Sequence, residues 1–431
     1  MPSTLALLLC LLSIAFLLRN EQKQSHSVSR ASWIPTFWVL YFASKPIARW
    51  IDPYGAIEES TADGLFLVGL IFLGLYVIAK RKLNWWAQVR QTRWLALLLG
   101  YMLLSCLWSD DPIGSFKQWV RVFGSFILAL TVLTEKEPTL ALQSIFRRTV
   151  YVLIPLSVVL IKYFPELGVV YRSWNGEKFW VGATIAKNGL GRLCLVCAVF
   201  LIWGLFSRWK GKSRPAWKYQ TQVEILLLFI IGWLLKGPGS DYAMTAIVLF
   251  GLCAAALLAL LVFNQQVANR FFSLFAGLTL VVAVTMTYCT VTGDIPSFGV
   301  QSLGRNVTFT GRTYIWDVVR KEAWENAILG VGYSAYWSRN REFPVVGMVN
   351  EGHNGYLDTF VETGVIGLIM LFIVLVSYIR RVSQERSYNF DWACFRIVFL
   401  FMLVVHNFTE TTFLRSSEHL WALFILMYMI F

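Results

Sequence analysis

Long apolar runs separated by short polar connectors constrain this chain more than any other feature. Of its 431 residues, 57% are hydrophobic and 15% are charged, whereas about a quarter of the residues of a soluble protein are charged. A helix that crosses a bilayer needs about 20 mostly apolar residues. Thirteen segments come near this length: 3–18, 33–49, 64–79, 94–108, 119–133, 149–163, 189–206, 222–235, 242–263, 271–290, 356–379, 392–407 and 418–431. The sequence therefore predicts an all-α polytopic membrane protein with about 12–13 transmembrane helices.

The net charge of +13 is concentrated in one set of connectors. Six of them hold 20 Lys and Arg but only 5 Asp and Glu, and they are 19–30, 80–93, 134–148, 207–220, 264–270 and 380–391. Alternating the thirteen spans from an outside N-terminus places all six on the same face, which the positive-inside rule assigns to the cytoplasm. The charge therefore reflects membrane topology, and nucleic acid is not an expected partner.

The remaining connectors are short except for 291–355, which is predicted to be one large extracytoplasmic loop. Loops of this length are usually functional or disordered, and its aromatic residues and mixed charge favour a functional loop. We expect a single membrane domain, with about ten spans in 1–290, the loop in 291–355 and further spans in 356–431. The first apolar run is interpreted as a span, with a cleaved signal peptide as the alternative.

Within the loop, the residues that follow Thr310 predict a helix, with Thr310 or Thr313 as its N-cap. Trp316, Val319 and Ala323 recur at helical spacing, so this helix is expected to lie on the membrane surface. Arg312 would stand at its N-terminus, where the helix dipole favours an anion. The alternative is that Arg312 only pairs with Asp317 or with a lipid phosphate.

A polar stripe enters the eleventh span. Asn354, Asp358 and Glu362 follow each other at intervals of four and share one helix face, and carboxylates at this depth normally face the protein interior or a wet cavity. His353 precedes them at the helix N-terminus, where the dipole disfavours its charged form. We therefore expect His353 to be neutral near pH 7 and able to act as a base, with helix capping as the alternative. Gly364 and Gly367 are expected to admit a neighbouring helix.

These residues resemble a known family. The run from His353 to Leu368 resembles the signature of the O-antigen ligase and polymerase family, in which a His-Asn pair opens a helix carrying Glu-x-Gly-x-x-Gly. Upstream, Gly311-Arg312 with Trp316 and Gly330-x-Gly332-Tyr333 match further elements in the same order. Three other motifs resemble the exopolysaccharide-polymerase-like branch: Trp33-Ile34-Pro35-Thr36-x-Trp38, Leu104-Ser105-x-x-Trp108-Ser109-Asp110 and Lys187-Asn188-x-Leu190-Gly191-Arg192.

The resemblance implies a GT-C-like membrane glycosyltransferase in the bacterial inner membrane, with its active site facing the periplasm. It would transfer a glycan from a polyprenyl-diphosphate carrier to an acceptor glycan or glycolipid, without a metal or cofactor, beside other polysaccharide-assembly proteins. Fixed cations would stabilise the leaving diphosphate, with Arg312 as the first candidate and Arg305 as the second. His353 would act on the acceptor hydroxyl, and Asn354, Asp358 and Glu362 would contact substrate.

One departure from the family pattern concerns a further arginine. Asp241 stands where the ligases are thought to hold the diphosphate with Arg, so Lys187, Arg192 or Lys236 would take over that contact, or the diphosphate would be held differently. Polar residues at the outer end of the twelfth span and in the loop that follows could line the same cavity or form an interfacial network: His406, Asn407, Glu410, Arg415, Glu418 and His419. The loop aromatics Phe309, Tyr314, Trp324, Tyr333, Tyr336 and Trp337 could equally stack on sugars or anchor the loop at the interface.

Two other classes of function compete with the enzyme. A transporter would also carry intramembrane carboxylates, but its binding residues usually lie in two related halves, which this chain lacks. A scaffold subunit of a polysaccharide-assembly complex would keep the motifs without using them. Between ligase and polymerase the sequence does not decide, because the two reactions share a donor and differ in their acceptor.

Overall fold

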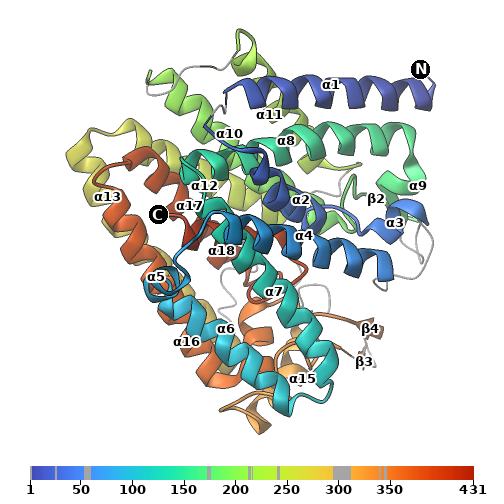
Figure 1. The fold of residues 1–431 in the computed structure, drawn as a ribbon. Helices are drawn as coiled ribbons and strands as arrows, with labels where there is room; N and C mark the ends of the chain where they lie inside the picture. The colour runs from blue at the N-terminus through green and yellow to red at the C-terminus, as the bar shows by residue number, and fades with distance from the viewer. Residues whose placement is uncertain are drawn as a thin grey trace. The chain divides into compact units, whose positions relative to one another are not determined.

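The computed structural model describes residues 2–24, 27–52, 60–171, 176–211, 215, 217–239, 243–294, 312–338, 341–343 and 347–431. Helices dominate these residues, and each of the thirteen predicted apolar segments contains one (Figure 1). Eight helices are long and apolar enough to cross a membrane by length and composition: α1 (Ser3–Gln24), α4 (Thr61–Lys80), α7 (Pro112–Leu133), α8 (Pro138–Tyr163), α10 (Lys187–Trp209), α12 (Met244–Val262), α13 (Gln265–Thr292) and α16 (Gly355–Glu385). The chain is therefore an all-α, multi-pass membrane protein, as predicted.

The remaining predicted spans are shorter helices: α6 (Arg93–Ser105), α11 (Gln220–Lys236), α17 (Phe390–His406) and α18 (His419–Met429). The segment 33–49 differs from its prediction because it is divided into α2 (Trp33–Phe42) and α3 (Ile47–Ile51). Pro46 stands immediately before α3, and a proline disfavours helical backbone in the residue before it. Neither piece is long enough to cross a bilayer by itself.

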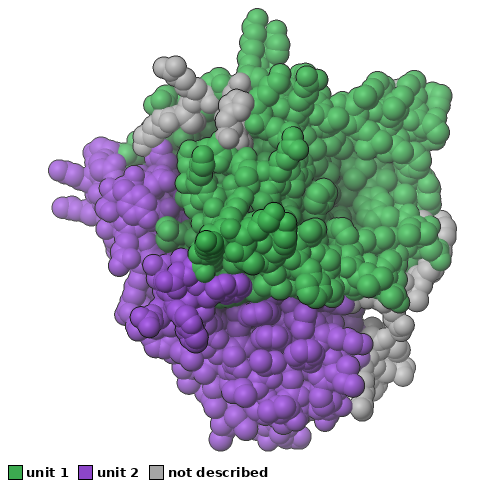
Figure 2. Space-filling view, viewed as in Figure 1, with its two compact units in different colours: residues 1–83, 125–263, 425–431 green, residues 84–124, 264–424 purple. Residues whose placement is uncertain are grey.

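The described chain forms two compact units, which Figure 2 distinguishes by colour. Unit 1 comprises 1–83, 125–263 and 425–431, and unit 2 comprises 84–124 and 264–424. Both α7 and α18 contribute residues to each unit. The single membrane domain expected from the sequence stays a prediction.

Unit 1 is organised around α8 and α10, which contact each other. Helix α8 also packs against α1, α2 and α11, while α10 packs against α11 and α12. Short elements complete the unit: η1 (Arg30–Ser32), α9 (Pro165–Gly168) and the antiparallel strands β1 (Val169–Tyr171) and β2 (Lys178–Trp180), in which Val170 pairs with Phe179.

Connectors that the charge pattern groups on one face contact each other within this unit. The Arg81 guanidinium lies 2.8 Å from Glu135 Oε1 and donates a 2.6 Å hydrogen bond to Ser29 Oγ. The Ser29 backbone N–H in turn donates to Glu135 Oε2. These three residues come from, or border, the connectors 19–30, 80–93 and 134–148, so their contacts follow the predicted grouping.

Unit 2 is organised around α16, which contacts α6, α13, α15 (Arg312–Glu325) and α17. Its other elements are α5 (Trp85–Gln91), η2 (Cys106–Trp108) and the antiparallel strands β3 (Arg341–Phe343) and β4 (Gly347–Val349). The predicted loop helix is thus confirmed as α15, although Thr313 lies inside it and cannot be its N-cap. Thr310 lies outside the described residues.

The apolar face of α15 packs on protein. Trp316, Val319 and Ala323 are buried in one cluster with Leu357 and Phe360 of α16. The expectation that this face lies on the membrane surface is therefore wrong, because α16 supplies the apolar partner that lipid was expected to supply. This packing fixes the position of α15 relative to the start of α16.

Helix α16 is interrupted at Gly364, which has φ 65° and ψ −169°. Residues that follow α15 supply hydrogen bonds at the interruption: the Val331 N–H donates to the Val361 carbonyl at 2.9 Å, and the Val365 N–H donates to the Ala327 carbonyl at 2.8 Å. A Cβ at position 364 would lie 2.3 Å from the Ile328 carbonyl oxygen. Gly364 therefore admits a loop and not the predicted helix. At Gly367 an added Cβ would meet Thr363 of the same helix.

Candidate functional site

Asn354 is the N-cap of α16. It has extended backbone (φ −154°), and its Oδ1 accepts hydrogen bonds from the N–H groups of Tyr356 and Leu357, both at 3.1 Å. Its Nδ2 donates to Thr290 Oγ1 on α13 at 3.2 Å. An N-cap side chain satisfies backbone donors that the helix leaves unpaired, so the capping role considered for His353 belongs to its neighbour.

His353 lies just outside the helix in the left-handed region, with φ 50°. Few residues other than glycine adopt this conformation, and such strain is frequent at functional sites. It directs the imidazole toward two carboxylates: Nδ1 lies 2.9 Å from Glu351 Oε1 and 3.4 Å from Glu410 Oε2. Because both carboxylates bind Nδ1, a substrate is expected to meet Nε2.

These two carboxylates change the charge expected for His353. Burial by itself lowers the pKa of His353, but the hydrogen bonds with Glu351 and Glu410 outweigh burial and raise the pKa from its usual 6.5 to about 9. The imidazole is then mostly protonated at pH 7. The expectation of a neutral His353 is wrong, because the adjacent carboxylates exceed the effect of the helix dipole.

Arg312 reaches the same carboxylate from the start of α15. Its Nη2 lies 3.0 Å from Glu410 Oε1, and its Nη1 donates to the Thr409 carbonyl. The pairing considered with Asp317 does not form, since Asp317 pairs with Arg320 on the next turn of α15. Arg312 and His353 therefore hold opposite oxygens of one carboxylate, Glu410.

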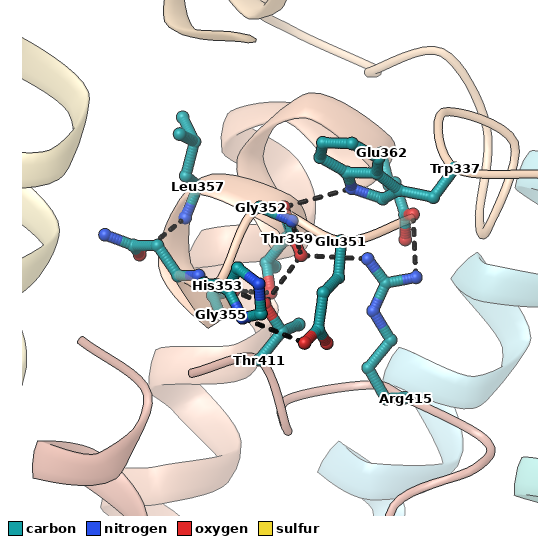
Figure 3. Close-up of polar contacts among 12 residues, drawn as sticks. Trp337, Glu351, Gly352, His353, Gly355, Leu357, Thr359, Glu362, Thr411 and Arg415 are labelled. Carbon is teal, nitrogen blue, oxygen red and sulfur yellow. Dashed lines mark hydrogen bonds and ion pairs between the residues drawn. The ribbon is translucent and has the colours of Figure 1, made fainter. Parts of the chain in front are cut away.

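The predicted polar stripe is buried and carries its own cation. Asp358 accepts hydrogen bonds from Trp337 Nε1 at 3.0 Å and Thr411 Oγ1 at 2.7 Å. Arg415 joins the two carboxylates of the stripe, with Nη2 2.9 Å from Asp358 Oδ2 and Nη1 3.2 Å from Glu362 Oε1 (Figure 3). An arginine fork between two carboxylates compensates their burial, and this confirms that the stripe faces the protein interior.

The segment 407–415 is itself anchored to the start of α16. Asn407 Oδ1 accepts hydrogen bonds from the N–H groups of Thr412 and Phe413, and the Asn407 carbonyl accepts one from Gly355 N–H at 2.8 Å. A Cβ at Gly355 would lie 1.9 Å from Asn407 Oδ1. This close approach places Glu410 and Arg415 at the site, as considered for the residues after the twelfth span.

The structure groups only some of the predicted site residues. His353, Arg312, Asn354, Asp358 and Glu362 lie together in unit 2, whereas Lys187, Arg192 and Lys236 belong to unit 1. Lys187 is the first residue of α10 and lies over the Phe179 ring, 5.2 Å from its centroid. Arg305 and Asp241 lie outside the described residues.

Glu351 is the site residue that the sequence analysis did not single out. Its only signal is its place two residues before His353, which does not show that the two side chains meet. Together with His353 and Glu410 it offers three atoms within 4.8 Å of one another that could hold a metal ion. The hydrogen bonds to His353 and the ion pair with Arg312 already use these atoms.

The cluster can support two kinds of chemistry. A histidine whose Nδ1 is fixed by carboxylates offers Nε2 to a hydroxyl proton, and an arginine at a helix N-terminus can stabilise developing negative charge. Glu410 connects the two, since one carboxylate sets the position of both groups. This arrangement suits transfer of a group from an anionic leaving group to an alcohol.

Comparison with known proteins agrees with this geometry. Residues 181–372 match the model of a family described as O-antigen ligase. Over these residues the chain is similar to O-antigen ligases. The matched residues include Lys187 and Arg192 of α10, Arg312 of α15 and the first part of α16, and the resemblance predicted from the sequence motifs is confirmed.

Relatives extend the likeness beyond the residues that this family model matches. The chain is similar to the exopolysaccharide production protein ExoQ of Rhizobium meliloti (strain 1021), with 26% identity over 317 residues, 68% of this chain and 67% of the relative. It is also similar to a predicted polysaccharide ligase of Rickettsia bellii (strain RML369-C), with 21% identity over 411 residues and 91% of each chain. No solved structure matches the chain. These findings support a role in polysaccharide ligation or polymerisation.

Proposed function

We propose that the protein transfers a glycan from a polyprenyl-diphosphate carrier to a sugar hydroxyl, on the periplasmic face of a bacterial inner membrane. The observation that carries the proposal is the sharing of Glu410 by Arg312 and His353. One group is a fixed cation and the other has a ring nitrogen available to an alcohol. The two tasks of the reaction therefore fall to adjacent side chains.

In the proposed reaction, the acceptor oxygen forms a bond to the anomeric carbon as the bond from that carbon to the diphosphate oxygen breaks. The acceptor proton passes to Nε2 of His353 in its neutral form, which is the minor form at pH 7, and the leaving diphosphate keeps the electron pair beside Arg312. Stabilising this charge with fixed donors is a large catalytic contribution. The residues present can perform both tasks without a metal ion, so we propose a metal-independent transferase.

Asp358, Glu362 and Arg415 are proposed to position the site. Their contacts are with each other and with Trp337, Thr411 and Gly352, so they set the backbone around His353. Asn354 acts likewise through the N-cap. The sequence predicted that the stripe binds substrate. We propose instead that it supports Arg312 and His353.

The test uses purified protein in detergent. Its substrate is lipid-linked glycan extracted from cells that lack the protein. We expect His353→Ala and Arg312→Ala each to lower product formation by about 100-fold or more. Arg320→Ala is the matched control, because it removes an ion pair from the same helix away from Glu410. Wild-type rates in both site variants, at normal protein levels, would contradict the proposal.

The same assay separates an enzyme from a transporter. Detergent removes the two compartments that transport requires, whereas a transferase still converts its substrate covalently. Product from the wild-type protein in detergent therefore excludes pure transport. The size of the product distinguishes ligase from polymerase, because polymerisation lengthens the glycan and ligation moves it to another carrier.

A further inference from the structure

The aromatic rings expected to stack on sugars are mostly inaccessible. Tyr333, Tyr336 and Trp337 are buried, so their faces are covered by protein. Other tryptophans of unit 2 are more accessible, among them Trp108, which is 38% exposed, and Trp324, which is 54% exposed. Trp108 belongs to the motif Leu104-Ser105-x-x-Trp108-Ser109-Asp110, for which the proposed reaction gives no role.

Trp108 lines an open cavity of about 550 Å³ in unit 2. One wall is formed by Trp108 and Asp110, at the end of η2. The other wall is formed by 325–331, which runs from the last residue of α15 to the interruption of α16. The volume falls within the usual range of small-molecule sites.

Hydrogen bonds fix both walls to the same helix. Tyr101 Oη on α6 donates to the Thr363 carbonyl at 2.8 Å and lies 3.2 Å from the Leu329 carbonyl. The Tyr333 N–H donates to Ser105 Oγ at 3.1 Å, and the Gly332 N–H donates to the Glu362 carbonyl at 3.0 Å. The cavity is therefore formed before a ligand arrives, which lowers the entropic cost of binding.

The lining selects against anions. Its charged side chains are Asp110 and Glu325, and its other polar side chain is Asn326. Carboxylates repel a diphosphate, but they accept hydrogen bonds from hydroxyl groups, and the amide both donates and accepts. Trp108 adds a partly exposed aromatic ring to the same lining. A lining that combines an aromatic ring with carboxylates and an amide fits a flat, uncharged, hydroxyl-rich ring.

We infer that this cavity binds uncharged sugar residues of the acceptor glycan, an inference that rests on the proposed function. Arg312 would take the diphosphate end of the donor, while the acidic cavity would take neutral sugar. The two sites are linked through α16, since Gly332 bonds to the carbonyl of Glu362 and Glu362 pairs with Arg415. Exposed Leu107 and Ile328 beside the cavity suit a glycan that is carried on a lipid.

The first experiment measures binding without turnover. Purified protein with the His353→Ala change is titrated by calorimetry with neutral oligosaccharides released by mild acid from the cell's own surface polysaccharide. We expect Trp108→Ala to weaken binding at least about fivefold, Asp110→Asn to weaken it less, and Trp108→Phe to restore most of the affinity. Trp324→Ala is the matched control, because Trp324 is similarly accessible and does not line the cavity.

Unchanged oligosaccharide affinity in Trp108→Ala would overturn the inference. The inference would also be overturned if Trp108→Ala bound the oligosaccharide normally but lost affinity for undecaprenyl diphosphate. The cavity would then hold the carrier. Rescue by Trp108→Phe guards against a folding defect.

Turnover measurements separate this inference from the proposed function. In the otherwise wild-type enzyme, we expect Trp108→Ala to raise KM for the acceptor and to leave KM for the donor unchanged. An acceptor KM that is equal in the wild type and in Trp108→Ala contradicts the assignment of the cavity and leaves the proposed function standing. Normal product from His353→Ala contradicts the proposed function.

Discussion

Glu410 is the residue that joins the two proposed catalytic groups. Its two oxygens hold Arg312 and His353, so one carboxylate positions both groups that are proposed to act on the substrate. An ion pair of this kind fixes geometry more than it adds stability. Substitutions around Glu410 should therefore change pH dependence and turnover more than folding.

His353 should give the reaction a basic pH dependence. With a pKa of about 9, about 1% of the imidazole is neutral at pH 7, so a step that needs the neutral base should accelerate as the pH rises toward 9. Glu351→Gln removes a carboxylate that raises this pKa. We expect the rising limb of kcat to move to lower pH in this variant. A rate that instead falls above pH 9 would show that His353 acts as a cation.

Arg312 should not be replaceable by lysine. Its guanidinium contacts Glu410 and the Thr409 carbonyl at the same time, and an ammonium lacks this planar fork. We expect Arg312→Lys to lower kcat by about 10- to 100-fold, the value of a charge-assisted hydrogen bond. Lys321→Arg, a matched exchange on the same helix, should leave kcat unchanged. A fully active Arg312→Lys would show that only the charge is needed.

Among the elements, α16 combines a membrane span with part of the site. The first nine residues of α16 are capped by Asn354 and include Asp358 and Glu362. The break at Gly364 separates them from the rest of the helix. The break depends on backbone supplied by residues 327–332. The loop after α15 is thus part of the packing of the span.

Gly364→Ala should destabilise this element. The backbone conformation at position 364 is nearly restricted to glycine and costs about 1–3 kcal/mol for other residues, and the new Cβ would lie 2.3 Å from the Ile328 carbonyl oxygen. We expect a lower Tm in detergent, measured by thermal unfolding. Gly277→Ala in α13 is the control, because nothing lies within 4 Å of its added Cβ. Equal Tm values for the two variants would contradict this account.

The sequence predicts elements better than contacts. Apolar length located a helix in all thirteen segments, and four-residue spacing identified the buried stripe of Asp358 and Glu362. Nothing in the sequence showed that Glu351 and Glu410 meet His353, because that contact depends on a left-handed backbone and on a segment almost 60 residues away. The charge of His353 was mispredicted for the same reason.

At the scale of the molecule, the connectors support one topology. Besides the contacts of Arg81 in unit 1, Arg386 of the connector 380–391 donates to the Asn269 carbonyl and to Ser273 Oγ, at or beside the connector 264–270. Connectors assigned to one face by charge therefore also meet in space within each unit. Which face is cytoplasmic follows from the charge rule alone.

Cysteine labelling can test that assignment. All seven native cysteines are buried, so an impermeant maleimide should leave the parent chain unlabelled. We expect Lys321→Cys on α15 to react in spheroplasts, and Ser387→Cys in the connector 380–391 to react only after lysis. The reverse pattern would invert the topology, and labelling of both in spheroplasts would contradict the alternation of spans.

Chelation tests metal independence on the whole enzyme. Because His353 and Arg312 already neutralise Glu351 and Glu410, we expect EDTA to leave the rate in detergent unchanged. EDTA could instead abolish activity, with a divalent cation restoring it in the wild type but not in Glu351→Gln. That result would assign a metal ion to Glu351, His353 and Glu410.

The interruption of α16 has a consequence for protein engineering. In hydrocarbon, a backbone group without a partner costs several kcal/mol, and residues 327–332 supply partners at this break. The loop that contains α15 therefore cannot be exchanged between relatives as an independent cassette. A chimera that receives a foreign loop should also receive the matching first half of α16, or the span will be left with a gap in its own hydrogen bonding.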